Sequence, residues 1–335
     1  MTLSLVTGAS GFVGQHLIAE LLRGGERVVG AVLGSPPELA TLPPEQAERV
    51  VWVEADLERP EDVRRLLAEN AVNKVFHLAA VTSVEESHSD PAAAFSVNVI
   101  GTLHLLRELT EARGRMGRDL RVVISGSAEV YGSAASRCRP LNEDCPLEPL
   151  NTYAVSKAAQ ELLGLQFQRA HGLPVVVARS FNHTGPGQLP PFVAPQLASQ
   201  IVAARNGDAA CTIKVGNPEI RRDFTDVRDV VKAYILLAER GVPGQVYNVC
   251  SGRSYAIGEL IQLLGEIAGI EVRMELDPER KRAVDVLEMV GDCSRLHAAT
   301  GWEAQIAIRE TLSGLLDSLQ TAGSKEAGAG AGAGA

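Results

Sequence analysis

The sequence has 335 residues, of which 45% are hydrophobic and 22% are charged, a composition typical of globular proteins. Its formal net charge of −9 argues against a surface for nucleic acid or an anionic membrane, so neither is expected as a partner. No apolar run is long enough to span a membrane. The cysteines are odd in number and lack metal-ligand spacing, which predicts no metal site and free thiols in a reducing cytoplasm. They are Cys138, Cys145, Cys211, Cys250 and Cys293.

A glycine-rich stretch follows the first apolar run, Leu3–Thr7, and leads into a helical pattern over Val13–Arg23. A strand, a tight glycine turn and a helix form the context in which such a loop binds a dinucleotide. A glycine turn without a ligand is the alternative. The helix N-terminus would offer N–H groups and partial positive charge to phosphates. The residues predicted to bind the cofactor here are Gly8, Ser10, Gly11, Phe12, Val13 and Gly14.

Each glycine of the loop has its own predicted task. Gly8 allows a sharp turn of the backbone. Gly11 lets a pyrophosphate approach the main chain, and Gly14 lets the helix pack close to the strand.

Apolar runs alternate with helical patterns through the first half of the chain, which predicts a Rossmann-type, doubly wound parallel sheet of the α/β class. The predicted strands are Leu3–Thr7, Arg27–Val32, Arg49–Glu54, Lys74–Leu78, Leu120–Ser125 and Val175–Ser180. The predicted helices are Val13–Arg23, Pro60–Glu69, Pro91–Ala112 and Tyr153–His171.

The rhythm changes near residue 182, where loops rich in proline and glycine begin. We predict a dinucleotide-binding domain over residues 1–181 and a smaller C-terminal α/β substrate-binding lobe over 182–322. A helix at Gln196–Arg205 and a strand at Cys211–Val215 belong to that lobe, and Val246–Val249 is expected to return to the first sheet. The alanine- and glycine-rich segment 323–335 is excluded from the fold as an added or disordered end.

The end of the second strand does not predict whether the cofactor carries a 2′-phosphate. Where an acid would bind a ribose diol or an arginine a 2′-phosphate, the chain reads Val32-Leu33-Gly34-Ser35, so NADH and NADPH stay open. Asp56, with Leu57, follows the third strand and is placed to meet the adenine. For Asp56, an N-cap of the helix at Pro60 is the alternative.

Tyr153 and Lys157 stand four residues apart in a helical pattern, so the phenol and the ammonium share one face. A nearby cation favours the phenolate, and we therefore expect Lys157 to lower the pKa of Tyr153 toward neutrality. A surface Tyr-Lys pair is the alternative. Ser127, after the fifth strand, is predicted to hydrogen-bond the oxygen that Tyr153 protonates, with a turn-forming serine as the alternative.

These three stretches, in this order, resemble the extended short-chain dehydrogenase/reductase family over residues 1–320. The resemblance implies that Ser127, Tyr153 and Lys157 are catalytic and that the last two also contact NADPH or NADH. It further implies that the cofactor is lined by His77, Leu78, Ala79 and Ala80 and that Asn98 supports the active-site helix. It also implies a homodimer through Pro91–Ala112 and Tyr153–His171, with packing of their apolar face on the sheet of the same chain as the alternative.

The second half is similar to the nucleotide-sugar branch of this family, through Arg179–Gln188 and Arg222–Asp229. The likeness implies that Arg222 grips a diphosphate, a task suited to forked, permanently charged donors. The other implied substrate-binding residues are Asn182, Arg282 and Asp285. The proline expected after Arg282 is Ala283 here, and surface ion pairing is the alternative for both arginines.

Within that branch, the stretches are most similar to reductases of GDP-linked 4-keto-6-deoxy sugars. The implied reaction is NAD(P)H-dependent reduction of the C4 ketone of such a GDP-sugar, with GDP-D-rhamnose as product. Ala128 cannot exchange a proton, which counts against a dehydratase, while Glu129 is kept as a candidate catalytic residue, a structural carboxylate or a substrate contact. A 4,6-dehydratase, a 4-epimerase and a non-catalytic dinucleotide sensor remain the alternatives.

Overall fold

In the computed structural model, the chain is described except for residues 1, 35–38, 117–118, 206–209, 279–285 and 333–335. Its main sheet has seven strands in the order β10-β6-β5-β4-β1-β2-β3, and every neighbouring pair is parallel. The strands are β1 (Leu3–Thr7), β2 (Arg27–Val32), β3 (Val50–Glu54), β4 (Lys74–His77), β5 (Arg121–Ser127), β6 (Val175–Ser180) and β10 (Val246–Val249). This order confirms the doubly wound architecture and the return of residues 246–249 to the sheet.

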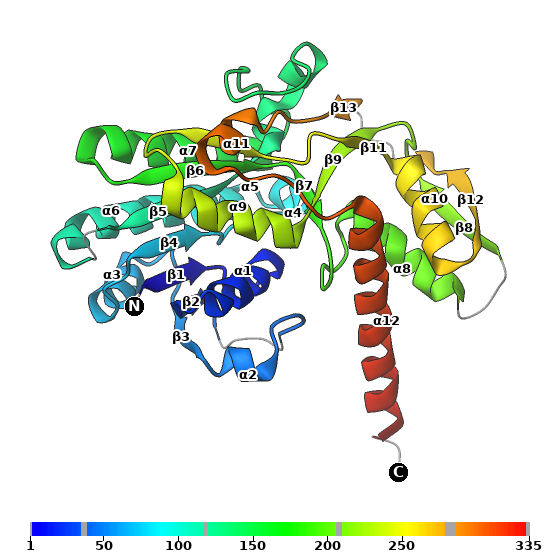
Figure 1. Ribbon diagram of the computed structural model, residues 1–335, viewed down its shortest axis with the longest axis horizontal. Helices are drawn as coiled ribbons and strands as arrows, with labels where there is room; N and C mark the ends of the chain where they lie inside the picture. Colours follow the sequence, from blue (N-terminus) through cyan, green and yellow to red (C-terminus); the bar gives the residue numbers. More distant parts are fainter. Residues whose placement is uncertain (1, 35–38, 117–118, 206–209, 279–285, 333–335) are drawn as a thin grey trace.

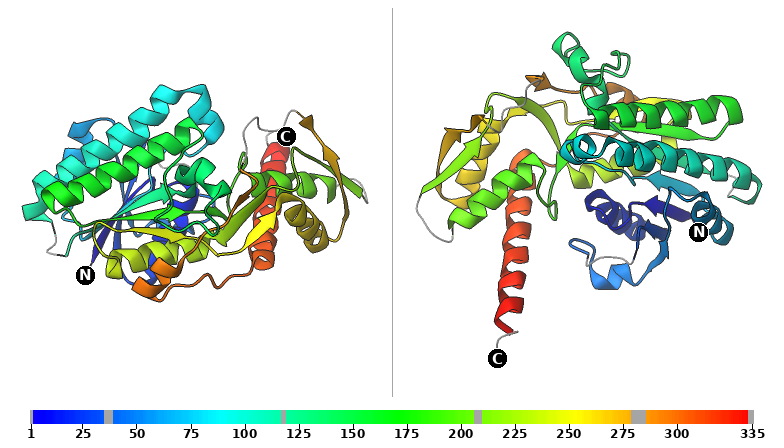
Figure 2. Two further views of the ribbon diagram at one scale, coloured as in Figure 1. Left: turned by 90° about the horizontal axis from the view of Figure 1, so that it is seen from above. Right: turned by 180° about the vertical axis from the view of Figure 1, so that it is seen from behind.

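Helices cover both faces of this sheet and bury two apolar cores against it. Figure 2 shows α6 and α7 on one side and α9 on the other. One face carries α1 (Phe12–Arg23), α9 (Val227–Arg240) and α11 (Ser294–Thr300), and the other carries α3 (Pro60–Glu69), α6 (Thr102–Ala112) and α7 (Thr152–His171). Shorter helices are α2 (Pro44–Ala47), α4 (Val84–Ser89), α5 (Pro91–Phe95), η2 (Arg113–Arg115) and η3 (Ala128–Ser136).

The single helix predicted over Pro91–Ala112 is wrong in detail. The segment divides into α5, a π-helical turn η1 (Ser96–Gly101), and α6. The side chain of Asn98, inside this turn, bonds the backbone N–H and carbonyl of Val81 and the hydroxyl of Ser156. A π turn widens the helix locally, and such turns occur often at functional sites.

The C-terminal lobe has two small sheets and three helices around an apolar core of its own. In the larger sheet, β9 (Arg221–Asp226) pairs with β7 (Asn182–Thr184), β11 (Ser254–Ala256) and β13 (Glu288–Met289); in the smaller, β8 (Ala210–Val215) pairs with β12 (Glu271–Leu276). The helices are α8 (Val193–Arg205), α10 (Ile257–Ala268) and α12 (Ile308–Gly332). This arrangement confirms a smaller α/β lobe beside the Rossmann-type sheet.

Helix α12 includes part of the C-terminal segment that the sequence analysis leaves outside the fold. The helix continues through residues 323–332 and projects away from the body of the molecule (Figure 1). Among the described residues, no helix combines the length and the apolar character needed to cross a membrane.

Candidate active site

The glycine loop has the geometry expected of a phosphate-binding turn. Gly8 adopts φ +68°, where other residues are strained, and a Cβ there would lie 2.9 Å from the amide nitrogen of Ala79. At Gly14 a Cβ would lie 2.4 Å from the carbonyl oxygen of Gly8, so only glycine lets α1 start this close to the loop. Gly11 caps α1 without a side chain, and the first-turn N–H groups of a helix lack partners within the helix. These features fit the pyrophosphate of a dinucleotide.

The other residues predicted to bind the cofactor lie around this turn. Ser10 is tied to α1, because its carbonyl accepts a hydrogen bond of 2.8 Å from Gln15, and Val13 packs at the edge of the core. Leu78, Ala79 and Ala80 follow β4, the strand beside β1, and all three are partly exposed. The structure therefore brings the loop and the end of β4 together, as a cofactor site requires.

Asp56 does not cap α3, so the N-cap alternative is wrong. Residue Arg59 occupies the cap position, and the Asp56 carboxylate instead accepts a hydrogen bond of 2.9 Å from the amide of Glu58. Leu57 beside it is buried, and its carbonyl bonds His104. The predicted contact of Asp56 and Leu57 with adenine stays a prediction.

The three candidate catalytic side chains meet where β5 ends and α7 begins. Tyr153 lies beside Ser127, the last residue of β5, whose side chain acts on the pKa of the phenol. The hydroxyl oxygen of Ser127 also accepts a hydrogen bond of 3.2 Å from the backbone N–H of Glu129. Ser127 therefore forms the turn as well. Lys157 lies one turn along α7 and is 3% exposed.

The electrostatics of Tyr153 differ from what the sequence predicts. Burial raises the pKa of Tyr153 to about 12; the side chain of Ser127 opposes this rise, and the charge of Glu129 adds to it. The expected lowering by Lys157 is wrong for the protein without ligands, because the amine points to the Ser125 carbonyl and the side chain of Gln160. Burial also lowers the pKa of Lys157 to about 7.

Glu129 stands beside this group without joining it directly. It is half-buried, and its carboxylate accepts a hydrogen bond of 3.2 Å from Asn151, which caps α7. This contact gives Glu129 a structural role, since it steadies the start of the helix that carries Tyr153.

The predicted substrate residues are only partly brought to this edge. Asn182 opens β7, directly after β6, and is partly exposed. Arg222, on β9, is 9% exposed and donates to the carbonyls of Arg221 and Val286 at 3.0 and 2.7 Å. Arg282 and Asp285 lie outside the described residues.

Arg179, the first residue of the segment that resembles a sugar-binding stretch, has a structural role. Its guanidinium makes two hydrogen bonds, of 2.8 and 2.6 Å, to the buried carboxylate of Glu161. It also donates to the hydroxyl of Tyr131 at 2.9 Å. This buried pair ties β6 to α7.

The segment that follows touches the start of α1. The rings of Phe12 and His183 stack with centroids 6.4 Å apart, and the His16 ring bonds the carbonyl of Pro186 at 2.9 Å. The predicted cofactor loop and the predicted substrate segment are therefore in contact.

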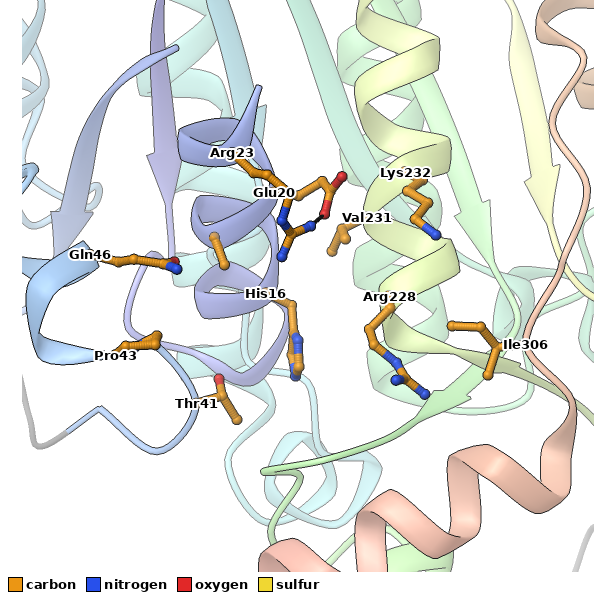
Figure 3. A pocket seen from close by; sticks show the side chains of 11 residues that line it. His16, Glu20, Arg23, Thr41, Pro43, Gln46, Arg228, Val231, Lys232 and Ile306 are labelled. Atoms are coloured by element: carbon orange, nitrogen blue, oxygen red, sulfur yellow. Dashed lines mark hydrogen bonds and ion pairs between the residues drawn. The ribbon is translucent and has the colours of Figure 1, made fainter. Parts of the chain in front are cut away.

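A cavity of about 400 Å³ lies on the outer side of α1 and α9, and His16, Arg228 and Lys232 line it (Figure 3). It contains none of the predicted site residues. Its cations are already paired, Arg228 with Asp226 at 2.8 Å and Lys232 with Asp229 at 3.5 Å. The cavity is therefore separate from the candidate active site.

Sequence reasoning missed three buried residues that support this site: Thr7, Thr102 and Gln160. They link Lys157 to the end of β1 through hydrogen bonds across four elements. A threonine or glutamine on an apolar helix face carries no signal of such a role until the helices are packed together.

Residues 5–315 match the family described as GDP-mannose 4,6 dehydratase. The chain belongs to this family. It lies within the extended short-chain dehydrogenase/reductases, as the three motifs indicated.

Two curated relatives are similar over most of the chain. GDP-6-deoxy-D-mannose reductase of Pseudomonas aeruginosa is 40% identical over 316 residues, which are 94% of this chain and 96% of the relative. GDP-6-deoxy-D-talose 4-dehydrogenase of Aggregatibacter actinomycetemcomitans is 30% identical over 87% of this chain and 89% of its own length. Among solved structures, the RMD protein of Pseudomonas aeruginosa complexed with NADPH aligns with a TM-score of 0.80 and 36% identity, covering 96% of this chain and 100% of the other.

Proposed function

We propose that the protein reduces the C4 ketone of GDP-4-dehydro-6-deoxy-D-mannose with NADPH and forms GDP-D-rhamnose. The likeness to GDP-6-deoxy-D-mannose reductase over 94% of the chain carries the proposal, because the Ser-Tyr-Lys geometry alone also suits epimerases and dehydratases of the same fold. The similar structure with NADPH supports NADPH over NADH.

Each residue at the edge of the sheet has a defined task in this reaction. The turn around Gly8 and the first turn of α1 hold the pyrophosphate. When bound, the reduced nicotinamide supplies a hydride to C4 of the sugar. Tyr153 gives its proton to the oxygen at C4, and Ser127 orients that oxygen by a hydrogen bond. Lys157 binds the ribose hydroxyls, while Asn182 and Arg222 hold the nucleotide part of the substrate.

Tyr153 carries its proton at neutral pH, as a group that protonates the ketone oxygen must. Burial raises its pKa to about 12 and makes it a weaker acid than one whose pKa matches the working pH. The serine loop also disfavours the dehydratase alternative, because Ala128 stands beside Glu129 and cannot transfer a proton.

A parallel assay distinguishes the proposed reaction from its alternatives. The purified protein is offered the 4-keto GDP-sugar with NADPH and with NADH, and absorbance of the reduced nicotinamide is followed. We expect NADPH to be consumed in proportion to the ketone. GDP-mannose serves as control for dehydratase activity, and conversion of GDP-mannose, or a nucleotide that stays bound through purification with no net oxidation, would overturn the proposal.

Tyr153→Phe removes the acid while keeping the ring. We expect turnover to fall about 10²-fold or more, because a positioned acid contributes at least that much. NADPH affinity, measured by fluorescence titration, should stay close to that of the wild type. Unchanged turnover would exclude Tyr153 from the reaction.

A homodimer is proposed through the outer surfaces of α5, η1 and α7. Large apolar side chains there stay exposed: Phe95 by 37%, Ile100 by 42%, Val155 by 40% and Leu162 by 53%. Burying such a patch is favourable. Light scattering should give twice the mass of the chain, and Leu162→Arg should convert it to monomer; a monomeric wild type would contradict the dimer.

We also propose a cytoplasmic location. All five cysteines are free, although Cys138 lies beside Cys145 and Cys250 beside Cys293. Free thiols persist in a reducing compartment. Cell fractionation with a periplasmic marker tests this, and co-purification with the marker would contradict it.

A further inference from the structure

The amine of Lys157 is held by two neutral oxygens. Its Nζ donates to the backbone carbonyl of Ser125 at 2.5 Å and to the side-chain oxygen of Gln160 at 2.5 Å. Lys157 is 3% exposed and Gln160 is fully buried, so water does not replace these contacts. An ammonium has three N–H donors, which leaves one for a cofactor or substrate.

Hydrogen bonding fixes which end of the Gln160 amide faces the lysine. The Thr102 hydroxyl has one hydrogen, and it donates that hydrogen to the carbonyl of Asn98 at 2.6 Å. Toward Gln160 it can therefore only accept, and the Gln160 Nε2 donates to it at 2.9 Å. The amide oxygen must then point at Lys157.

The same argument extends to His77. Its Nε2 lies 2.8 Å from the Thr102 oxygen and must carry the hydrogen, since the hydroxyl is already committed. Its Nδ1 then accepts from Thr7 at 2.8 Å. Thr7, in turn, accepts the amides of Leu78 and Ala79, both at 3.2 Å. One buried network, in which the donors on both sides point toward Thr102, thus connects the glycine-loop strand to Lys157.

We propose that Gln160 is a positioning residue for Lys157: its amide oxygen fixes the amine against β5, and its neutrality leaves the ammonium charge uncompensated. The role assigned to Gln160 rests on the proposed function only in treating Lys157 as the catalytic lysine. Burial lowers the pKa of Lys157 to about 7, and the charge of Lys157 helps burial to lower the pKa of His77 to about 3. A carboxylate in place of the Gln160 amide would raise the pKa of Lys157 again.

In the part of the chain that the structure describes, few other titratable groups surround the amine. His77 faces it from β4, and Tyr153 lies one turn away on α7 with Glu129 beyond it. Tyr234 on α9 bonds the hydroxyl of Ser125 at 3.2 Å. Glu161 on α7 is committed to Arg179 at 2.6 Å. The Gln160 side chain thus accepts directly from the Lys157 amine. Replacing its NH2 group by oxygen, as in Gln160→Glu, changes its charge at nearly constant size.

The test is an NMR titration of the lysine side chains in protein labelled with 13C at lysine Cε. The sequence holds six lysines, and Lys157→Met assigns the resonance of interest. We expect Gln160→Glu to move the titration midpoint of Lys157 up by about one pH unit or more, because an opposite charge in contact favours the ammonium. Gln160→Met should move the midpoint down, because it removes an acceptor from the charged form.

Gln166→Glu is the matched control, since it makes the same change on the exposed face of α7. It should leave the midpoint of Lys157 in place. A wild-type midpoint in folded Gln160→Glu would overturn the inference; if that variant does not fold, a wild-type midpoint in Gln160→Met would do so. The titration needs no substrate, so a shifted midpoint in a protein that fails to reduce the keto sugar would overturn the proposed function and leave the role of Gln160 intact.

Discussion

The two lobes treat their buried polar groups differently. Beside the main sheet, Thr102 and Gln160 are fully buried and bonded into one network that ends at Lys157. Four buried side-chain atoms lack a hydrogen-bond partner among the described residues, and three of them are in the C-terminal lobe: the hydroxyls of Thr184 and Thr225 and the side-chain oxygen of Gln188. The fourth is the side-chain oxygen of Gln46, on α2. Buried polar groups are normally paired, so we expect ligand or water to complete this second set.

This difference indicates which half of the molecule has its polar side chains fixed before a ligand binds. The half that carries Tyr153 and Lys157 is held rigid by protein groups alone, which positions reacting atoms before any ligand arrives. In the half with Thr184 and Thr225, these two hydroxyls lack such protein partners among the described residues. Variants that remove a bonded group should therefore cost stability beside the main sheet, and variants that remove an unpaired hydroxyl should cost little in the other lobe.

The largest effect is expected at the buried pair Arg179–Glu161. Glu161→Gln leaves a buried guanidinium without its counter-charge, and we expect the free energy of unfolding to fall by about 3–5 kcal/mol. Glu111→Gln makes the same change at the exposed pair with Arg107 and should cost less than about 0.5 kcal/mol. Urea unfolding measures both, and equal losses would show that burial of the pair does not matter.

Much of the fold follows from the sequence, because its elements are set by local patterns. β1, β2, β6 and β10 begin and end at the predicted residues, since each is an apolar run between residues that break it. The division of Pro91–Ala112 escaped prediction, because the π turn accompanies contacts of Asn98 with Val81 and Ser156. Those contacts exist only after α7 has packed.

Some features of the candidate site also follow from the sequence, and others depend on how the chain packs. The approach of Tyr153 and Lys157 follows from helical spacing, and that of Ser127 from its place at the end of a strand. The direction of the Tyr153 pKa shift could not be predicted, because burial decides it and burial is a property of the packed molecule. Gln160 was missed for the same reason, since it meets Thr102 across 58 residues of sequence.

A matched pair of threonines tests the contrast between the lobes more finely. Thr102 and Thr184 are both buried, at 0% and 1% exposure, but of the two side-chain hydroxyls only that of Thr102 has hydrogen-bond partners among the described residues. Thr102→Val should cost about 1–3 kcal/mol, because it leaves donors of His77 and Gln160 unsatisfied. Thr184→Val should leave the free energy of unfolding unchanged or raise it. A loss at Thr184 as large as that at Thr102 would mean that the two lobes do not differ in this respect.

The smallest effect is a pH dependence that arises from His77. Its pKa is lowered to about 3 in the folded protein, chiefly by burial and also by Lys157, against about 6.5 when unfolded. Between these values the unfolded chain binds a proton that the folded protein does not, so stability falls as the pH falls. From pH 6.5 to 5 the wild type should lose about 1.5 kcal/mol more than His77→Asn. His171→Asn, at an exposed histidine, should keep the wild-type slope. Parallel slopes for wild type and His77→Asn would mean that the network tolerates a charged His77, and the half beside the main sheet would then be less rigid than its hydrogen bonds indicate.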